Sequence, residues 1–223
     1  MLTRIDHVVI GVADLRAGID AYTRIGFEVD ELGVARNDGD QLELALGSDG
    51  LQSIALASDD LAADSAAVRA RGSVDWIDLV GRSGARPPTR HPNGVQRIER
   101  VYIAVADVAA AAREYARVLG VPEPKMERGT VINADMAIFQ FGATALGLAQ
   151  PAAPGVAADA LHSRGPGPFQ ILYRTTSMDA AAKWMAGHGV PPPARGIRNT
   201  GEQAMLVAPA HACGVYIGFV GPA

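Results

Sequence analysis

An internal repeat constrains the fold of this chain more than any other feature of its 223 residues. Residues 5–15 align without gaps on residues 98–108, at an offset of 93 residues. Six positions of the alignment are identical: Ile5 and Ile98, Val8 and Val101, Ile10 and Ile103, Val12 and Val105, Ala13 and Ala106, and Asp14 and Asp107. A chain with such a repeat is expected to form the same supersecondary unit more than once.

Each copy of the repeat has the pattern of a strand followed by a helix. Apolar residues alternate with others over residues 8–12, and this period of two is typical of a strand. Asp14 is a predicted helix N-cap, because its carboxylate can accept hydrogen bonds from the unpaired amides of a first helical turn. Gly26 is expected to end that helix. In the second copy the same two roles fall on Asp107 and Gly120.

Two weaker units have the same order. Residues 53–61 lead into a helix that is expected to end near Gly72, and residues 170–178 lead into one that is expected to end near Gly189. The offset between these units is constant at 117 residues, so four strand–helix units form two pairs. Candidates for the strands that follow the helices are residues 27–32, 41–46, 77–80, 131–133, 137–141, 145–149, 203–207 and 215–220.

The charge and composition exclude several classes of protein. The chain has 20 Lys and Arg against 24 Asp and Glu, a net charge of −4, and a pI of about 5.7. A nucleic-acid-binding domain would show a basic stripe, so no nucleic-acid partner is expected. The start of the chain does not resemble a signal peptide, and no apolar run approaches the roughly 20 residues that cross a bilayer. With one cysteine, Cys213, the composition favours a cytoplasmic protein without a membrane partner.

Two segments carry a resemblance to a known family. Residues 6–15, Asp-His-Val-Val-Ile-Gly-Val-Ala-Asp-Leu, are similar to the opening of many glyoxalase-like proteins, and residues 211–220 are similar to their closing strand. The chain thus resembles the vicinal oxygen chelate superfamily of glyoxalases, bleomycin resistance proteins and dioxygenases. The resemblance implies an α+β fold of repeated βαβββ modules, paired into two half-barrel domains. Residues 1–97 would be a shortened glyoxalase-like domain of two modules, and residues 98–223 a second domain of two modules.

The resemblance also implies where a metal would bind. Family members typically hold a divalent ion with a His on the first strand of each module and a Glu or Gln on the last, and the ion acts as a Lewis acid. In the first module His7 and Glu43 stand at these positions, so both are predicted metal ligands and catalytic residues. The next His position is Ser53, a poor ligand, and His91 or Glu99 is the candidate for a further ligand. The ion would be Fe, Mn, Ni or Zn.

The second half of the chain lacks these ligands. The resemblance implies that the four metal positions of this half correspond to Arg100, Gly147, Gln170 and Gly218. A guanidinium cannot ligate a cation, so no family-type metal is expected there. Arg100 instead favours a carboxylate or phosphate on a ligand. The structural alternative is a buried ion pair of Arg100 with Glu99 or Glu127.

The strand pattern around Arg100 predicts which side chains would meet such a ligand. Arg100 and Tyr102 alternate with apolar residues, so they would share one face of the strand. Gln170 and Tyr173 from the partner module are predicted to complete this substrate-binding group. His91 has its own structural alternative, because His-Pro-Asn-Gly is typical of a turn.

Two functions of different class remain open from the sequence. The first is an enzyme of lyase, isomerase or dioxygenase type that acts on a small oxygenated, anionic substrate with a divalent metal at His7 and Glu43. The second is a metal-free protein that binds or sequesters a small molecule with the same fold. The loss of ligands in the second half favours the second function, and the fold alone does not decide. Either protein would be a monomer or a homodimer, since four modules can complete two half-barrels in one chain.

Overall fold

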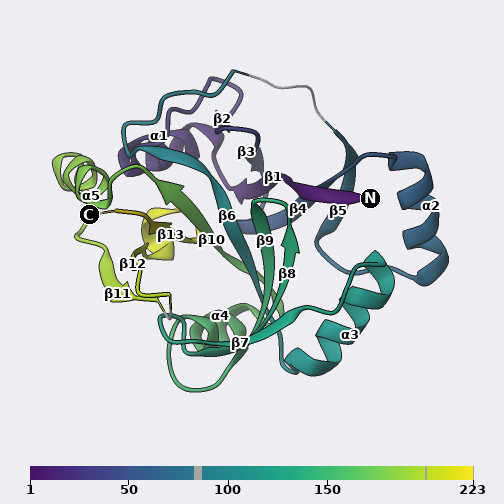
Figure 1. Cartoon of the computed structure of the whole chain (residues 1–223). Helices are drawn as coiled ribbons and strands as arrows, with labels where there is room; N and C mark the ends of the chain where they lie inside the picture. The colour runs from purple at the N-terminus through teal and green to yellow at the C-terminus, as the bar shows by residue number, and fades with distance from the viewer. Residues whose placement is uncertain (83–86, 199, 223) are drawn as a thin grey trace.

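The computed structural model describes residues 1–82, 87–198 and 200–222 and shows an α+β protein with two β-sheets (Figure 1). The first half of the chain forms a five-stranded sheet with the strand order β2-β3-β1-β4-β5. Its elements are, in chain order, β1 (Leu2–Val12), α1 (Leu15–Ile25), β2 (Val34–Arg36), β3 (Gln41–Leu46), β4 (Gly50–Ser58), α2 (Leu61–Arg71) and β5 (Ile77–Gly81).

The second half forms an eight-stranded sheet with the strand order β11-β12-β13-β10-β6-β9-β8-β7. Its elements are, in chain order, β6 (Val95–Ala104), α3 (Val108–Leu119), β7 (Lys125–Gly129), β8 (Ala134–Phe141), β9 (Thr144–Pro151), α4 (Val156–Arg164), β10 (Gly167–Thr175), α5 (Met178–Gly187), β11 (Ala194–Ile197), β12 (Gln203–Val207), the short 3₁₀ helix η1 (Pro209–His211) and β13 (Tyr216–Val220).

The eight-stranded sheet consists of two complete βαβββ modules. β6, α3, β7, β8 and β9 make one module, and β10, α5, β11, β12 and β13 make the other. In each module the last strand returns to pair in parallel with the first, as β9 does with β6 and β13 does with β10. The modules meet where β6 and β10 pair antiparallel. The predicted fold class, α+β with repeated βαβββ modules, is confirmed.

The five-stranded sheet keeps the same plan with fewer strands. β1 pairs in parallel with β3, β4 pairs in parallel with β5, and β1 meets β4 antiparallel. The two modules are therefore shortened to βαββ and βαβ. The offset found in the sequence holds in the structure, since β4 covers Gly50–Ser58 and β10 covers Gly167–Thr175.

Two strand predictions are wrong. Residues 27–32 do not form a strand, because the carboxylate of Asp30 accepts hydrogen bonds from the amides of Leu32 and Val34 and holds a turn. Residues 131–133 also lie in a turn, and the strand there is β7, five residues of sequence Lys-Met-Glu-Arg-Gly. A charged edge strand has no apolar alternation by which the sequence would indicate it.

The helices of the repeat begin and end at the predicted capping residues. Asp14 accepts a hydrogen bond from the amide of Ala17 at 2.7 Å, and Asp107 accepts one from the amide of Ala110 at 2.9 Å. Gly26 follows α1 with a φ of 100°, a left-handed conformation that favours glycine. These three caps were expected from the sequence and are confirmed.

One hydrophobic core runs through both halves of the chain. The apolar positions of the repeat, such as Val8 in β1 and Val101 in β6, are fully buried in it. Phe27, which follows α1, packs edge-on against Tyr173 of β10 with ring centroids 5.0 Å apart, and its ring lies 6.4 Å from that of Phe219 in β13. These aromatic contacts join the two sheets.

A β-bulge interrupts the central strand of each sheet at the same position of the repeat. The register of β1 against β4 shifts just before His7, and that of β6 against β10 shifts just before Arg100. The extra residues are Asp6 and Glu99, which are equivalent in the repeat. Each bulge therefore sets an acidic residue next to the first-strand position that carries a metal ligand in the family.

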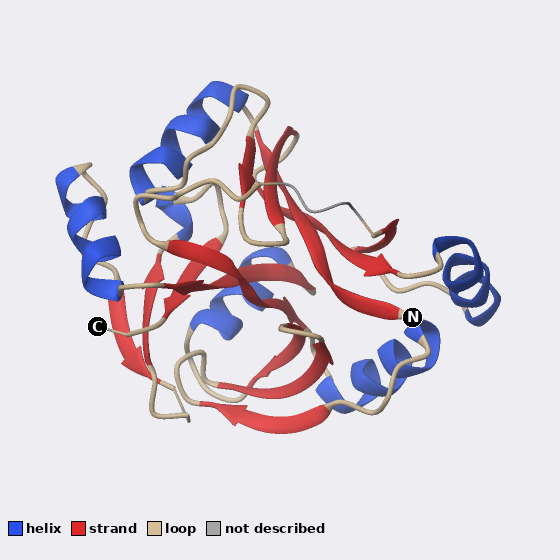
Figure 2. Ribbon diagram, turned by 45° about the horizontal axis from the view of Figure 1, so that its top comes forward, coloured by secondary structure: helices blue, strands red, loops and turns tan. Residues whose placement is uncertain are grey.

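The eight-stranded sheet curls until its two edge strands approach each other (Figure 2). The hydroxyl of Thr130, just after β7, donates a hydrogen bond to the backbone oxygen of Ile197 in β11 at 3.3 Å. α4 occupies part of the concave face, where Ala157 and Ala160 are buried among apolar side chains. The curl and the helix together confine the space that remains on this face.

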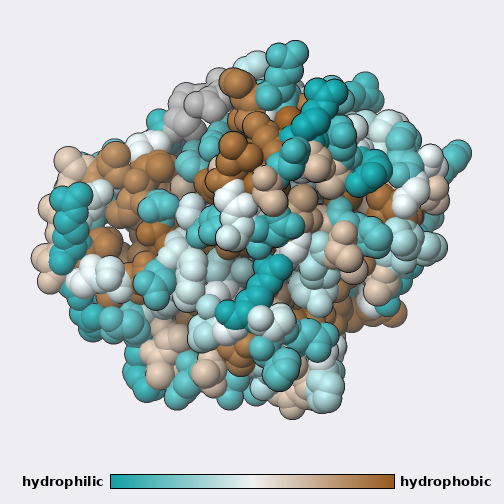
Figure 3. Space-filling model, turned by 180° about the vertical axis from the view of Figure 1, so that it is seen from behind, coloured by the Kyte–Doolittle hydropathy of each residue, from teal (hydrophilic) through white to brown (hydrophobic). Residues whose placement is uncertain are grey.

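The outer surface of the protein is mixed in character. On the face seen from behind, hydrophilic residues cover much of the area, and hydrophobic residues gather around a hollow at the left edge (Figure 3). That edge corresponds to the side on which α2 and α3 lie in Figure 1. Among the described residues, no helix combines the length and apolar character needed to span a membrane.

Candidate functional site

His7 lies in β1, on the face of the first sheet opposite to the buried Val8. The bulge brings the carboxylate of Asp6 within 3.2 Å of Nδ1 of the His7 ring. This hydrogen bond raises the pKa of His7; burial acts to lower that pKa, and the charges of Glu43 and Asp78 add to the increase. The partly buried imidazole is therefore an acid–base group whose protonated form is stabilised.

Glu43 lies on the same face as His7. The parallel ladder of β1 and β3 sets Gln41 opposite His7 and Glu43 opposite Val9. Residues two apart on a strand share a face, so the carboxylate and the imidazole project from one side of the sheet. The side-chain amide of Gln41 donates a hydrogen bond to the Glu43 carboxylate.

Asp78 in β5 is a further candidate that the sequence reasoning missed. Ala55 of β4 lies opposite both His7 and Asp78, so Asp78 belongs to the same face. At the 117-residue offset Ala55 is equivalent to Leu172, which pairs with Gly218. Asp78 thus occupies the closing-strand acid position of the second module. The strand was predicted, but its role as a closing strand was hidden because the module has lost two strands.

The donor set of the first sheet does not fit the metal of the family. Within the described part of the chain, no three His, Cys, Asp or Glu side chains lie close enough together to hold a metal ion. The structure brings His7 and Glu43 to one face and does not add His91 to them. His7 and Glu43 alone are short of the three protein ligands of most catalytic metal sites, and Asp78 does not lie close enough to complete such a set.

Both ring nitrogens of His91 are engaged by the protein. Its Nδ1 accepts a hydrogen bond from the amide of Glu28 at 3.0 Å, so Nε2 carries the proton and donates to Oδ1 of Asn37 at 2.9 Å. Burial lowers the pKa of His91, which keeps the ring neutral. In this arrangement His91 joins the segment before β6 to the end of β2.

The second sheet contains a pocket of about 350 Å³ close to the place where β7 and β11 approach each other. Charged and polar side chains form one part of its lining: Arg100, Tyr102, Lys125, Glu127, Thr130, Arg198 and Thr200. Apolar side chains form the rest: Val131, Ile132 and Met136. A cavity with convergent polar groups and apolar walls is typical of a small-molecule site.

Arg100 lies in the wall of this pocket. Its Nη1 donates to the carboxylate of Glu127 at 3.0 Å and to the hydroxyl of Tyr102 at 3.3 Å, and its guanidinium carbon lies 5.6 Å from the centre of the Tyr102 ring. Burial acts to raise the pKa of Glu127, but Arg100 and Lys125 outweigh it and hold that pKa below its ordinary value. The ion pair of Arg100 with Glu127, which the sequence analysis gave as the alternative to ligand binding, is therefore present. It forms part of the pocket wall.

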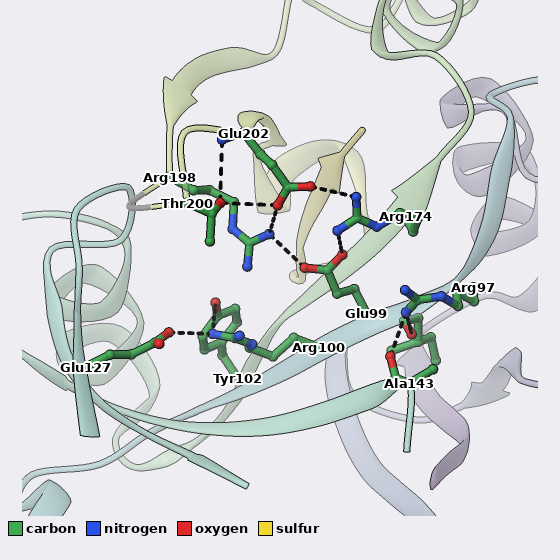
Figure 4. A network of polar contacts seen from close by, with 11 residues as sticks. Arg97, Glu99, Arg100, Tyr102, Glu127, Ala143, Arg174, Arg198, Thr200 and Glu202 are labelled. Atoms are coloured by element: carbon green, nitrogen blue, oxygen red, sulfur yellow. Dashed lines mark hydrogen bonds and ion pairs between the residues drawn. The ribbon is translucent and has the colours of Figure 1, made fainter. Parts of the chain in front are cut away.

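Arg198 brings a second guanidinium to the pocket from the turn between β11 and β12 (Figure 4). Its Nη1 donates to Glu99 at 2.7 Å and to Glu202 at 2.8 Å. Arg174 of β10 bridges the same two carboxylates, at 2.7 Å from Glu202 and in contact with Glu99. Two arginines and two glutamates thus form a closed ring of ion pairs. No sequence pattern indicated Arg198, because only the curl of the sheet brings its turn to Arg100.

In this half, side chains of neighbouring residues occupy the space beside the two glycines at the family's metal positions. A Cβ atom on Gly147 would lie 2.7 Å from the ring of Tyr102, and one on Gly218 would lie 2.7 Å from Cδ1 of Leu172. Neither position has room for a carboxylate unless its neighbours move. With arginine and glutamine at the two remaining positions, the residues present do not fit a metal here either.

Gln170 and Tyr173 lie apart from the pocket lining. Gln170 is opposite Tyr102 in the ladder of β10 and β6, and it is buried with its Oε1 unpaired among the described residues. Tyr173 points to the other face, where it is fully buried against Phe27. Of the four predicted binding residues, only Arg100 and Tyr102 line the pocket.

Comparison with known proteins agrees with this architecture. Residues 99–208 match the model of the Glyoxalase/Bleomycin resistance protein/Dioxygenase superfamily. No curated protein matches the chain. Methylmalonyl-CoA epimerase from Mycobacterium tuberculosis is 27% identical, with a TM-score of 0.52, and the match covers 58% of this chain and 90% of that one. A variant of the epimerase from Streptomyces coelicolor, in complex with 2-nitronate-propionyl-CoA, is 25% identical with a TM-score of 0.50, over 58% and 99% of the two chains.

One solved structure resembles the chain over nearly its whole length. A variant of 4-hydroxymandelate synthase from Streptomyces coelicolor matches 99% of this chain and 93% of its own with a TM-score of 0.71, and at 14% identity it shows likeness of fold alone. The matched family region runs from β6 to beyond the end of β12, which is the part of the chain that holds the pocket. The resemblance to the Glyoxalase/Bleomycin resistance protein/Dioxygenase superfamily is thus confirmed for this region, which is slightly less than half of the chain.

Proposed function

We propose that the pocket of the second sheet binds a small organic anion through Arg100 and Arg198, without a metal ion. The observation that carries the proposal is the presence of two guanidinium groups from two different modules in one cavity of about 350 Å³. Hydrogen bonds between an arginine and a carboxylate are among the strongest that proteins make. The apolar wall around Ile132 and Met136 would hold the rest of the molecule.

The charges of the pocket favour binding over acid–base chemistry. The carboxylate of Glu127 is held by Arg100 at 3.0 Å and by Lys125 at 3.4 Å. A carboxylate with a lowered pKa and two cationic partners is a weak general base. The metal-free binding alternative is therefore better supported in this half than a lyase, isomerase or dioxygenase.

The similar solved structures are compatible with an anionic ligand. The Streptomyces coelicolor epimerase variant was solved with 2-nitronate-propionyl-CoA, a ligand with an anionic acyl group. At 25% identity that protein suggests a class of ligand for the matched region and does not identify one. We therefore propose a carboxylate-type organic anion.

Calorimetric titration with benzoate and its neutral isostere benzamide tests the proposal. The two probes share a ring that the apolar wall can contact, and only benzoate carries a charge. We expect benzoate to bind at least about tenfold more tightly, since a hydrogen bond to a charged group contributes about 1.5–3 kcal/mol. Arg100→Met should abolish this preference. Arg117→Met, which removes a guanidinium from the exposed Arg117–Glu114 pair of α3, should keep it.

Benzoate and benzamide that bind with the same affinity, or a benzoate preference that survives in R100M, would show that the guanidinium does not recognise the ligand. The control variant ensures that a change in net charge alone is not mistaken for recognition.

A second candidate function is supported by the first sheet. It is the metal-dependent lyase, isomerase or dioxygenase expected from the resemblance: the register sets His7, Glu43 and Asp78 on one face, although in the described structure they are not close enough together to hold a metal ion. Elemental analysis of protein purified without a His-tag or chelator, after supplementation with Mn, Fe, Ni or Zn, tests this candidate. Stoichiometric metal that is lost in His7→Ala would support it. Sub-stoichiometric metal under every supplement would exclude it.

A further inference from the structure

We infer that Glu99 and Glu202 set the charge of the pocket so that it accepts a monocarboxylate in preference to a dianion. The inference rests on the proposed function and concerns the same pocket. It assigns a specificity-determining role to two glutamates that do not line the cavity themselves.

The two glutamates neutralise Arg198 without removing its hydrogen-bond donors. Only Nη1 of Arg198 is used, by Glu99 at 2.7 Å and Glu202 at 2.8 Å. Among the described residues its Nε and Nη2 have no partner, and Arg198 lines the pocket with only 14% of its side chain exposed. Figure 4 shows the guanidinium of Arg198 on the side of the ring that faces Arg100 and Tyr102. Arg198 therefore offers donors to a ligand while its charge is already balanced.

The ring of ion pairs has no net charge. Arg174 and Arg198 supply two positive charges, and Glu99 and Glu202 supply two negative ones. Each glutamate contacts both arginines, so the four groups form a closed circuit and not two separate pairs. Within this network Arg174 holds the pKa of Glu202 below its ordinary value, which favours the ionised carboxylate.

The remaining charged groups of the pocket leave one positive charge. Arg100 and Lys125 are cations, and Glu127 is a carboxylate that pairs with both. One carboxylate on a ligand balances the pocket. A second would find no cation left and would lie near Glu127, and a partly buried charge without a partner is strongly disfavoured.

The β-bulge of β6 makes this arrangement possible. An unbulged strand would turn Glu99 away from the side that carries Arg100 and Tyr102. The equivalent bulge residue of β1, Asp6, contacts Arg4 and His7. The proposed preference of the second-sheet pocket for one negative charge is called the charge filter below.

The test compares benzoate with isophthalate, which adds a second carboxylate to the same ring. By calorimetric titration at low salt, the wild-type chain should bind benzoate at least about tenfold more tightly than isophthalate. Glu99→Gln and Glu202→Gln each add one positive charge to the pocket, so each should shift the isophthalate-to-benzoate affinity ratio toward isophthalate by about tenfold. Glu114→Gln makes the same change in α3, away from the pocket, and should leave the ratio unchanged.

The outcomes separate this inference from the function on which it rests. A wild-type chain that binds benzoate but shows the same affinity ratio in both glutamine variants would overturn the charge filter and leave anion binding intact. A wild-type chain that does not bind benzoate would remove both. If E99Q does not fold, the more exposed Glu202 gives the same measurement through the second variant.

Discussion

Single residues decide what equivalent positions of the repeat can do. His7 and Arg100 occupy the same position of β1 and β6, each next to an acidic bulge residue. The backbones are alike, yet an imidazole beside Asp6 is an acid–base group, whereas a guanidinium binds and orients anions. Likeness of fold therefore does not transfer an activity from one half of the chain to the other.

Asp40 is a buried carboxylate at the junction of the two halves. Its Oδ2 accepts a hydrogen bond from the amide of Ile98 at 2.9 Å, and its Oδ1 accepts one from the side chain of Asn37 at 2.5 Å. Burial raises the pKa of Asp40 to about 7, although these hydrogen bonds act to lower it. Since the folded-state pKa lies above the ordinary 3.8, the stability that this group contributes is complete at low pH and is lost as the pH rises toward 7.

We expect Asp40→Asn to remove this pH dependence. Through Asp40 the wild-type chain should lose up to about 4 kcal/mol of unfolding free energy between about pH 4 and about pH 7. Urea denaturation at about pH 5 and about pH 8 measures the change, and D40N should gain stability relative to wild type at the higher pH. Asp38→Asn, at an exposed neighbouring residue, should retain the wild-type slope. A slope in D40N equal to that of wild type would contradict the assignment.

At the scale of elements, the repeat preserves the way in which helices start. α1 and α3 both begin after an aspartate that accepts an amide hydrogen bond, from Ala17 in one case and from Ala110 in the other. α4 lacks a side-chain cap and begins after Gly155, and its stability comes from packing against the concave face of the sheet. Helices of the repeat are thus specified locally, whereas α4 depends on its surroundings.

Asp107→Ala should destabilise the protein by about 1 kcal/mol, because the amide of Ala110 loses its acceptor at the start of α3. Urea denaturation followed by circular dichroism measures the loss. Asp135→Ala removes an exposed carboxylate from the Arg128–Asp135 pair and should change stability by no more than about 0.5 kcal/mol. An effect of D107A as small as that of this control would show that the cap contributes nothing.

At the scale of the whole molecule, the two halves depend on a common interior. The proposed division into residues 1–97 and 98–223 falls within β6, which runs from Val95 to Ala104. The core continues across this boundary, and Phe27 of the first half packs against Tyr173 and Phe219 of the second. The division therefore remains a prediction about the repeat, and we do not expect the halves to unfold separately.

Phe27→Ala should lower the unfolding free energy by about 3–5 kcal/mol, because it leaves a cavity between the halves. Trp76 lies in the first half, and Trp184 lies in the second half, where its indole nitrogen donates a hydrogen bond to the backbone oxygen of Thr23 in α1. Variants with one tryptophan each therefore follow the first half and the contact between the halves. Both should unfold in one coincident transition, which moves to lower denaturant in F27A. Leu32→Ala, at a residue that is 76% exposed, should have little effect. Two separate transitions would show that the halves fold alone.

The repeat, the helix caps, most strands and the fold class could be predicted from the sequence alone. These follow from local alternation and capping, which act over a few residues and leave a direct pattern. The sequence also predicted that Arg100 and Tyr102 share one face of their strand, because residues two apart on a strand point the same way. Both residues line the pocket. β7 escaped prediction because a charged edge strand has no apolar pattern.

The set of residues that meet at the pocket depends on how distant strands come together. Arg198 and Arg100 lie 98 positions apart in the chain, and the curl of an eight-stranded sheet sets them in one cavity. Tyr173 lies in the core instead, because it is three residues from Gln170 in β10 and so points to the opposite face, together with Ile171. Register and curvature arise from contacts between distant strands, so no short stretch of sequence encodes them.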